Sequence, residues 1–258
     1  MSRSPRVRQR RGAVNIVVGA FGELLITAGV LTGLFVVWQL WWTDVVALRE
    51  QEQVLQALDW TPPAPVVVEA PPEPRRDPPP VDPEPAFGVV FAQMYVPRFG
   101  ADWVAPIANG VDRRQILDVL GVGHYPGTAM PGDLGNVSLA GHRTTFGRPF
   151  HLIADLQPGD PIVIRTERTW YVYRMTSNAI VYPRQVEVVA PVPGLRAGDP
   201  LPELTQRFLT MTACHPMYSA RQRFVVHAEF DYWLPVSEGI PQDLVDAGVR
   251  VVGAEAGA

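Results

Sequence analysis

The sequence predicts a mostly β domain, a barrel or a sandwich, that follows a single N-terminal membrane helix. From Phe87 onward, short runs of β-branched and aromatic residues alternate with Gly and Pro turns, and helical periodicity is weak. Near the N-terminus, an uncharged apolar stretch is long enough to cross a bilayer. With 258 residues, the chain can form one mid-sized domain with appendages.

Residues 1–12 form a basic segment that we expect to lie in the cytoplasm. The segment contains five arginines, and no acidic residue occurs before Glu23. Because the whole chain has a net charge of -4, this local cluster indicates membrane topology and not a nucleic-acid-binding surface. We therefore predict no nucleic-acid partner.

Residues 13–43 are predicted to form a transmembrane anchor. The stretch 24–43 carries no charge and has the ~20 residues that a membrane-spanning helix needs. Trp38, Trp41 and Trp42 gather at its end, where aromatic side chains favour the membrane interface. A cleavable signal peptide is the alternative, but its apolar core has only ~7–15 residues and ends in small residues. We expect a single-pass protein of the cell membrane, with its N-terminus cytoplasmic and its folded domain extracellular.

Three further segments are predicted to carry no core of their own. Residues 44–60 have an amphipathic helical pattern, which we interpret as a solvated juxtamembrane helix. Residues 61–86 contain eleven prolines and predict an extended linker; a ligand for a proline-recognition domain is the less favoured alternative. Residues 237–258 are polar and small, which predicts a flexible C-terminal tail without a second membrane span.

Residues 87–236 are predicted to form the folded domain. Its helical periodicity is confined to one short candidate, 113–121. Strand-like patterns occur in six places, namely 87–100, 163–177 (two strands around a turn), 179–191, 136–140, 208–214 and 223–230.

The only cysteine of the chain, Cys214, ends the predicted strand 208–214. Alternation places its thiol on the more polar face, and places Leu209, Met211 and Ala213 on the apolar face. If this strand pairs antiparallel with 223–230, Cys214 lies near Arg223. A free cysteine is usually a small buried hydrophobe, but an unpaired thiol outside the cell is also a candidate reactive group.

A thiol nucleophile needs a proton-transfer partner and a group that stabilises an oxyanion. His142 follows a short apolar strand and a glycine, and such a strand end suits a groove. The spacing of the five histidines does not select one of them; the others are His124, His151, His215 and His227. A metal site made by His142, Cys214 and His215 is disfavoured because the ligands lack paired spacing. We therefore expect neither a metal nor another cofactor.

Two stretches resemble sortases. "LTMTACHPMYSARQRFVV" resembles the family's Thr-Leu-x-Thr-Cys signature, which an arginine and a β-branched run follow, although Met211 replaces its Leu and Ala213 its second Thr. "GHYPGTAMPGDLGNVSLAGHR", followed by "PFHLIADLQPGDPIVI", resembles the family's histidine-bearing region. The resemblance covers roughly residues 87–234. With the anchor and linker, the chain is most similar to class E housekeeping sortases of high-GC Gram-positive bacteria.

The resemblance implies a fold and a set of site residues. The fold is an eight-stranded sortase-type β-barrel with short helices. The resemblance implies Cys214 as the nucleophile, His142 as its proton partner and Arg223 as the cation that stabilises the oxyanion, with Arg221 as the rival arginine. Four further residues are candidates for substrate binding: Thr212, Ala213, Trp103 and Tyr125.

The implied activity is that of a cysteine transpeptidase. It cleaves an LAxTG/LPxTG-type sorting signal at the C-terminus of surface proteins, between Thr and Gly, through a thioester. An amine of the peptidoglycan precursor lipid II then accepts the protein. A pilus-polymerising sortase is one alternative, although its Asp-Pro-aromatic lid would correspond here to Asp82, Pro83 and Glu84, which lack the aromatic residue. A non-catalytic surface-binding domain on a stalk is the other alternative.

Overall fold

The computed structural model describes residues 12–60, 63 and 72–254. The chain divides into two compact units, Met1–Trp42 and Thr43–Ala258. The basic segment 1–11, much of the first half of the predicted linker and residues 255–258 lie outside the described residues.

Helix α1 comprises Ala13–Ala57 and joins the predicted membrane helix to the predicted juxtamembrane helix without a break. Its apolar part is long and hydrophobic enough to cross a membrane, and the side chains described there are almost all exposed. This confirms the predicted apolar N-terminal helix, which is consistent with an anchor or with a signal sequence.

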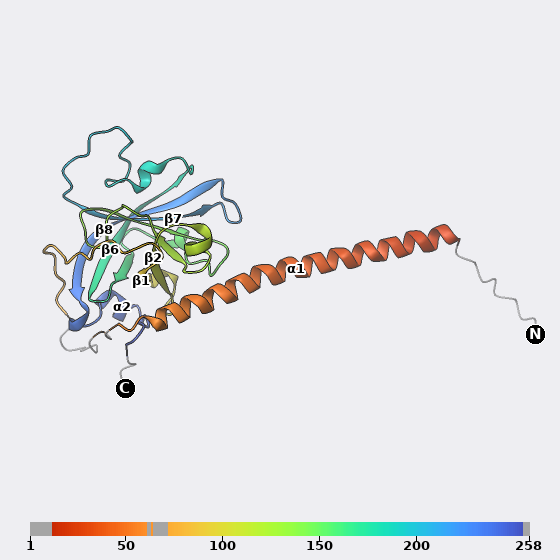
Figure 1. The fold of residues 1–258 in the computed structure, drawn as a ribbon, viewed down its shortest axis with the longest axis horizontal. Helices are drawn as coiled ribbons and strands as arrows, with labels where there is room; N and C mark the ends of the chain where they lie inside the picture. Colours follow the sequence, from red (N-terminus) through yellow and green to blue (C-terminus); the bar gives the residue numbers. More distant parts are fainter. Residues whose placement is uncertain (1–11, 61–62, 64–71, 255–258) are drawn as a thin grey trace, which may run out of the picture. The chain divides into compact units, whose positions relative to one another are not determined.

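The described residues of the second unit form a closed barrel of eight strands, as predicted (Figure 1). Neighbouring strands follow the order β1-β2-β3-β4-β7-β8-β6-β5. Pairing is antiparallel except between β2 and β3 and between β4 and β7. The strands are β1 Val90–Tyr95, β2 Val104–Asn109, β3 Val122–His124, β4 Gly135–Gly141, β5 Pro161–Arg165, β6 Thr169–Val181, β7 Arg207–His215 and β8 Gln222–Pro235.

The barrel core is filled by alternate side chains of these strands. In β7, Leu209, Met211 and Ala213 are buried in this core, as their alternation predicts. The intervening side chains of β7 therefore point to the outer face of the barrel. This places Cys214 on the outer face, two residues beyond Thr212.

Short helical turns connect the strands: η1 Pro97–Phe99, η2 Arg113–Leu117, η3 Ile153–Asp155, η4 Val186–Val189 and η5 Val236–Glu238. The candidate helix 113–121 is only the π-helical turn η2, whose N-cap Asp112 accepts two backbone N–H groups. Residues 186–189 are a 3₁₀ turn and not the predicted strand. Strand β6 ends just before Tyr182 and Pro183, and proline cannot donate to a ladder.

Residues 72–86 of the predicted linker lie along the barrel. The indole N–H of Trp233 donates to the carbonyl of Asp77 at 3.0 Å, and the hydroxyl of Tyr171 donates to the carbonyl of Pro80 at 2.8 Å. An extended proline-rich chain has unpaired carbonyls, and these satisfy side-chain donors of the barrel. This differs from the predicted domain boundary at residue 87, because the packed region begins at least fifteen residues earlier, at 72.

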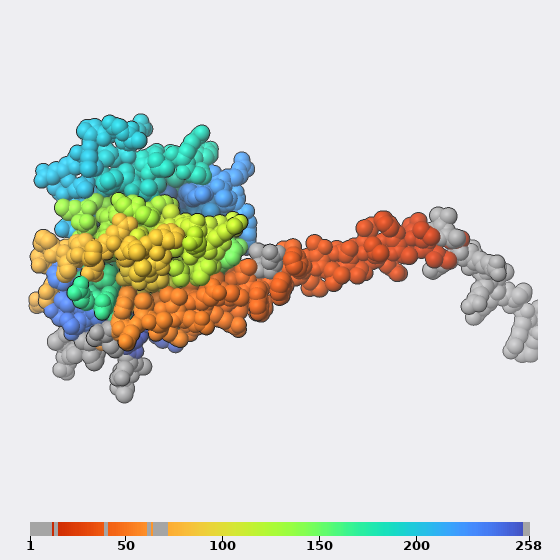
Figure 2. Space-filling model, viewed as in Figure 1, coloured from red at the N-terminus to blue at the C-terminus, as the bar shows by residue number. Residues whose placement is uncertain are grey.

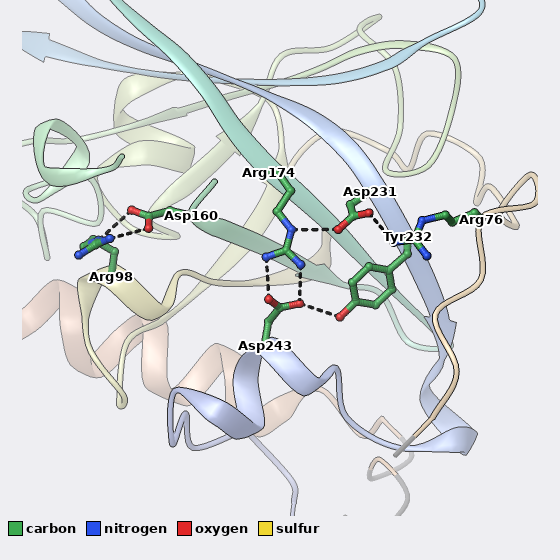
Figure 3. A network of polar contacts seen from close by, with 7 residues as sticks. All are labelled: Arg76, Arg98, Asp160, Arg174, Asp231, Tyr232 and Asp243. Carbon is green, nitrogen blue, oxygen red and sulfur yellow. Dashed lines mark hydrogen bonds and ion pairs between the residues drawn. The ribbon is translucent and has the colours of Figure 1, made fainter. Parts of the chain in front are cut away.

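The described part of the predicted flexible tail, residues 237–254, also packs on the barrel and includes helix α2, Gln242–Asp246. Asp243 accepts two hydrogen bonds from Arg174, at 2.6 and 3.0 Å, and one from the hydroxyl of Tyr232 at 2.8 Å (Figure 3). Burial raises the pKa of Tyr232, and the carboxylate of Asp243 raises it further. Composition does not predict this docking, because the contacts of Asp243 with Arg174 and Tyr232 join residues that are not neighbours in the sequence.

Residues 43–57 of α1 belong to the same compact unit as the barrel. Ala47, Gln51 and Leu55 are only 2%, 5% and 5% exposed and share one helical face. The sequence pattern predicts a solvated spacer here, but the structure buries this face of the helix.

Candidate functional site

Cys214 lies near the end of β7, directly opposite Arg223 of β8. This antiparallel pairing across the loop 216–221 is the one that alternation predicts. The thiol is half-buried and forms no disulfide. Its position on the outer face leaves it accessible from a groove rather than enclosed in the barrel core.

His142 reaches the same end of the barrel through a parallel strand. Strands β4 and β7 are parallel, and Ala140 is the register partner of Thr212. Two residues further along the chain come His142, which directly follows β4, and Cys214 of β7. Because parallel neighbours end at the same edge of a sheet, this register brings the imidazole and the thiol to one end of the barrel.

An open groove with a volume of about 590 Å³ lies at this end of the barrel. The residues that line it include Cys214, His142, Arg223, Thr212, Ala213 and Tyr125. Trp103 is not among its lining residues and packs edge-to-face on Phe99, with ring centroids 5.0 Å apart. The structure therefore brings together six of the seven predicted site residues.

Asp118 binds His142 and is not among the predicted site residues. Its carboxylate lies 2.6 Å from Nε2 of His142, and the ring of Phe146 lies 5.3 Å from the imidazole. Asp118 directly follows η2 and lies within the segment 113–121, which the sequence marks only as a short helix. The contact joins residues 24 positions apart in the sequence, and the only available signal is an acid beside an apolar turn.

The Asp118 contact leaves one imidazole nitrogen available. Within the described part of the chain, Nδ1 of His142 has no hydrogen-bond partner. An imidazole held through Nε2–H by a carboxylate has an acceptor lone pair on Nδ1. His142 can therefore exchange a proton through Nδ1 while Asp118 holds the ring through Nε2.

The guanidinium of Arg223 has no acidic partner among the residues that the structure describes. Its Nη1 donates to the carbonyls of Ala220, at 2.9 Å, and Gln222, at 3.0 Å. No carboxylate among residues 12–60, 63 and 72–254 forms an ion pair with it. The rival, Arg221, does not line the groove. Arg223 is thus the arginine placed to bind negative charge beside Cys214.

Thr212 and Tyr125 form the polar wall of the groove. The hydroxyl of Thr212 donates to the carbonyl of Leu139 at 3.2 Å and lies 3.0 Å from the hydroxyl of Tyr125. Ala213, where the family signature has a threonine, is 2% exposed and packs in the barrel core. A larger polar residue there would add volume and a hydroxyl to a closely packed region.

The other four histidines have partners outside the groove. His124 is fully buried between Asn109 and the carbonyl of Ala129, and burial lowers its pKa. His227 contacts the hydroxyl of Thr210, and burial also lowers its pKa. Nδ1 of His215 contacts Arg143, and that of His151 donates to the Arg143 carbonyl.

Residues 12–60, 63 and 72–254 contain no group of three or more His, Cys, Asp or Glu side chains placed to hold a metal ion. The site instead combines a thiol, an imidazole and a guanidinium around an open groove. These groups can supply a nucleophile, a proton carrier and an oxyanion partner for acyl transfer.

Known proteins are similar to this chain over most of its length. The family model described as the sortase domain matches residues 94–231. Sortase SrtE1 of Streptomyces coelicolor is 38% identical over 257 residues, which cover 95% of this chain and 67% of that protein. Sortase SrtE2 of the same organism is 33% identical over 237 residues, covering 87% of this chain and 86% of that protein.

Solved structures show the same barrel. The SrtA sortase from Actinomyces oris superposes with a TM-score of 0.61 at 38% identity, covering 69% of this chain and 100% of that chain. Sortase E1 from Streptomyces coelicolor, solved with a tripeptide in its active site, gives a TM-score of 0.54 at 38% identity. That match covers 61% of this chain and 97% of the other.

Proposed function

The chain belongs to the sortase family of cysteine transpeptidases and is of the class E type, and we propose that Cys214, His142 and Arg223 perform its acyl transfer. The observation that carries this proposal is their common groove: strand pairing sets Cys214 opposite Arg223, and the parallel register brings His142 to the same end. The substrate in this proposal is a surface protein with a C-terminal Leu-Ala/Pro-x-Thr-Gly signal.

The first half of the reaction forms a thioester. The Cys214 proton moves to Nδ1 of His142, and the thiolate attacks the carbonyl carbon of the signal's threonine. The oxyanion of the tetrahedral intermediate is stabilised by the guanidinium of Arg223. When the Thr-Gly bond breaks, the proton on His142 passes to the departing glycine amine, and the threonine acyl group stays on the sulfur.

The second half of the reaction transfers the acyl group. A primary amine of a cell-wall precursor, lipid II in this proposal, attacks the thioester and loses a proton to His142. Collapse of the second tetrahedral intermediate forms an amide and releases Cys214, which regains the proton. Hydrolysis of the thioester is the competing reaction, so the amine must occupy the groove more effectively than water.

Asp118 has a positioning role in this mechanism. Its carboxylate contacts Nε2 of His142 and holds the ring through both proton transfers. The carboxylate also restricts rotation of the imidazole, so that Nδ1 stays available for proton transfer.

We assign the substrate contacts to two of the four predicted residues. Thr212 and Tyr125 line the groove beside Cys214 and are in reach of the signal. Ala213 also borders the groove, but its side chain packs in the barrel core, so we assign it a packing role. Trp103 packs on Phe99 outside the lining, so we assign it a packing role. The linked hydroxyls of Tyr125 and Thr212 are suited to recognise a peptide carbonyl or amide.

The location in the proposal is the cell membrane, with the barrel outside the cell. The apolar part of α1 would anchor the protein, and the basic residues before it would keep the N-terminus in the cytoplasm.

The alternative function, pilus polymerisation, gains no support from the segment 82–84. Asp82 pairs with Arg168, and Glu84 binds Asn109 and Gly127, all outside the groove lining.

The decisive experiment uses purified chain, LAxTG and LPxTG peptides and a primary amine, with products identified by mass. We expect the natural sequence to release the glycine fragment and to form the amide product, and we expect Cys214→Ala to form neither. His142→Ala should lower kcat by about 10²–10⁴-fold, and Arg223→Ala by about 10²-fold. Cleavage that persists in Cys214→Ala would refute the assignment, and loss of cleavage on adding a chelator would favour the metal alternative.

A further inference from the structure

The loop after His142 has a backbone conformation that its own residues disfavour. Phe146, Gly147 and Arg148 have φ angles of 55°, 75° and 40°. Only glycine adopts this left-handed region freely, because the Cβ of any other residue comes too close to the backbone there. Such a conformation persists only where contacts from elsewhere hold it.

The contacts that hold this loop come from residues 43–57 of α1. The carboxylate of Asp44 accepts a hydrogen bond from the backbone N–H of Gly147 at 3.1 Å and pairs with Arg148 at 3.4 Å. The side-chain amide of Gln51 donates to the carbonyl of Phe146 at 3.4 Å. Each of the three left-handed residues is therefore held by the helix.

Gln51 also packs between two glycines that belong to different loops. A Cβ added at Gly121 or at Gly147 would lie 3.0 Å from the Gln51 side chain. Gly121 comes three residues after Asp118, and Gly147 comes five residues after His142. One buried side chain thus contacts both segments that bring Asp118 and His142 within 2.6 Å of each other.

The residues that make this contact lie on one face of the helix. Asp44, Ala47, Gln51 and Leu55 recur at intervals of three and four residues, which places them on one side of a helix. Figure 2 shows this part of the chain, in orange, against the yellow and green segments of the same compact unit. A buried glutamine is costly unless its amide is satisfied, so its presence at the centre of the face indicates a specific contact.

We propose that residues 43–57 are a positioning element of the active site, and that Asp44 and Gln51 are its positioning residues. They set the left-handed loop and the Gly121 segment against each other. This arrangement fixes Phe146 beside His142 and keeps the imidazole on Asp118. The inference rests on the proposed function of His142, and it makes the juxtamembrane helix part of the catalytic machinery rather than a spacer.

The test compares Gln51→Ala with Gln53→Ala in the full chain in detergent micelles. Gln53 is exposed on the same helix and makes no described side-chain contact, so it is a matched control. We expect Gln51→Ala to lower kcat about tenfold with little change in KM, because a misplaced catalytic group slows chemistry more than binding. Gln53→Ala should match the natural sequence.

A second pair of variants separates positioning from folding. Asp44→Ala removes the acceptor for Gly147, whereas Asp44→Asn keeps an acceptor oxygen there. We expect Asp44→Ala to lower kcat and to shift the pH profile of kcat/KM, and we expect Asp44→Asn to restore much of both. Rates are normalised to the folded fraction of each variant, measured by near-ultraviolet circular dichroism, which removes any effect of unfolded protein.

Two results overturn the inference. One is a normalised kcat of Gln51→Ala and Asp44→Ala equal to that of Gln53→Ala; the other is a loss that normalisation abolishes. Failure of the proposed function gives a different outcome, because the natural sequence itself would then form no amide product, or Cys214→Ala would remain active.

Discussion

At the scale of single residues, the contacts of the site differ in how far the sequence alone predicts them. The pairing of Cys214 with Arg223 follows from alternation in two neighbouring strands. The choice of His142 among five histidines requires the family resemblance, because spacing alone leaves all five open. The contact of Asp118 with His142 follows from neither, since it depends on how a turn folds over the barrel edge.

A prediction at this scale concerns the buried histidines. Burial lowers the pKa of His227 below its ordinary value of 6.5, so the unfolded chain binds more protons than the folded chain below that pH. The free energy of unfolding should therefore fall as the pH falls through about 6.5, and it should continue to fall until the folded-state pKa is passed.

Thermal unfolding between about pH 7.5 and about pH 5.5 measures this effect. We expect the melting temperature to decrease over this interval, and we expect His227→Gln to reduce the decrease. Because burial also lowers the pKa of His124, the single variant should retain part of the slope. A slope that His227→Gln leaves unchanged would contradict the role assigned to burial at this position.

At the scale of elements, α2 is held on the barrel by a small network of charged groups. Arg174 of β6 binds Asp243 of α2 and Asp231 of β8, and Asp231 also pairs with Arg76 of the proline-rich segment (Figure 3). The network thus joins the barrel to the proline-rich segment before it and to helix α2 after it. Helix α2 has only five residues, so its stability must come from this docking and not from its own propensity.

We predict that Asp243→Asn lowers the free energy of unfolding by about 2 kcal/mol, because it weakens charge-assisted hydrogen bonds from Arg174 and Tyr232. Asp246→Asn is the matched control, since Asp246 is exposed on the same helix and, among the described residues, has Gln242 as its one side-chain hydrogen-bond partner. Urea unfolding of both variants is the measurement. Equal midpoints would show that the docking contributes nothing to stability.

At the scale of the whole molecule, the folded domain extends beyond the residues that the strand pattern predicts. The proline-rich residues 72–86 add backbone carbonyls that bind Trp233 and Tyr171, and the Arg75 backbone pairs with that of Trp233. An extended segment with few apolar residues has no core of its own, but a barrel with unpaired side-chain donors provides its partners.

A truncation series tests this boundary. We expect a chain that begins at Phe87 to melt about 5 °C below one that begins at Pro72, because at least two side-chain hydrogen bonds of about 1 kcal/mol each are lost. Calorimetry of the two fragments is the measurement. Melting temperatures that coincide would restore the boundary at residue 87 that the strand pattern predicts.

The sequence by itself determined the periodic and compositional features: the apolar helix, the β domain, the polar face of β7 that carries Cys214 and its pairing with Arg223. These depend on near neighbours in the chain or on one strand pair. The tertiary structure alone decided the Asp118 contact, the packed proline-rich segment, the docked α2 and the contact of Gln51 with two glycines. Each of these contacts joins residues that are not neighbours in the sequence. A pattern of neighbouring residues cannot predict which distant group pairs with a donor or an acceptor, or which one covers a buried face.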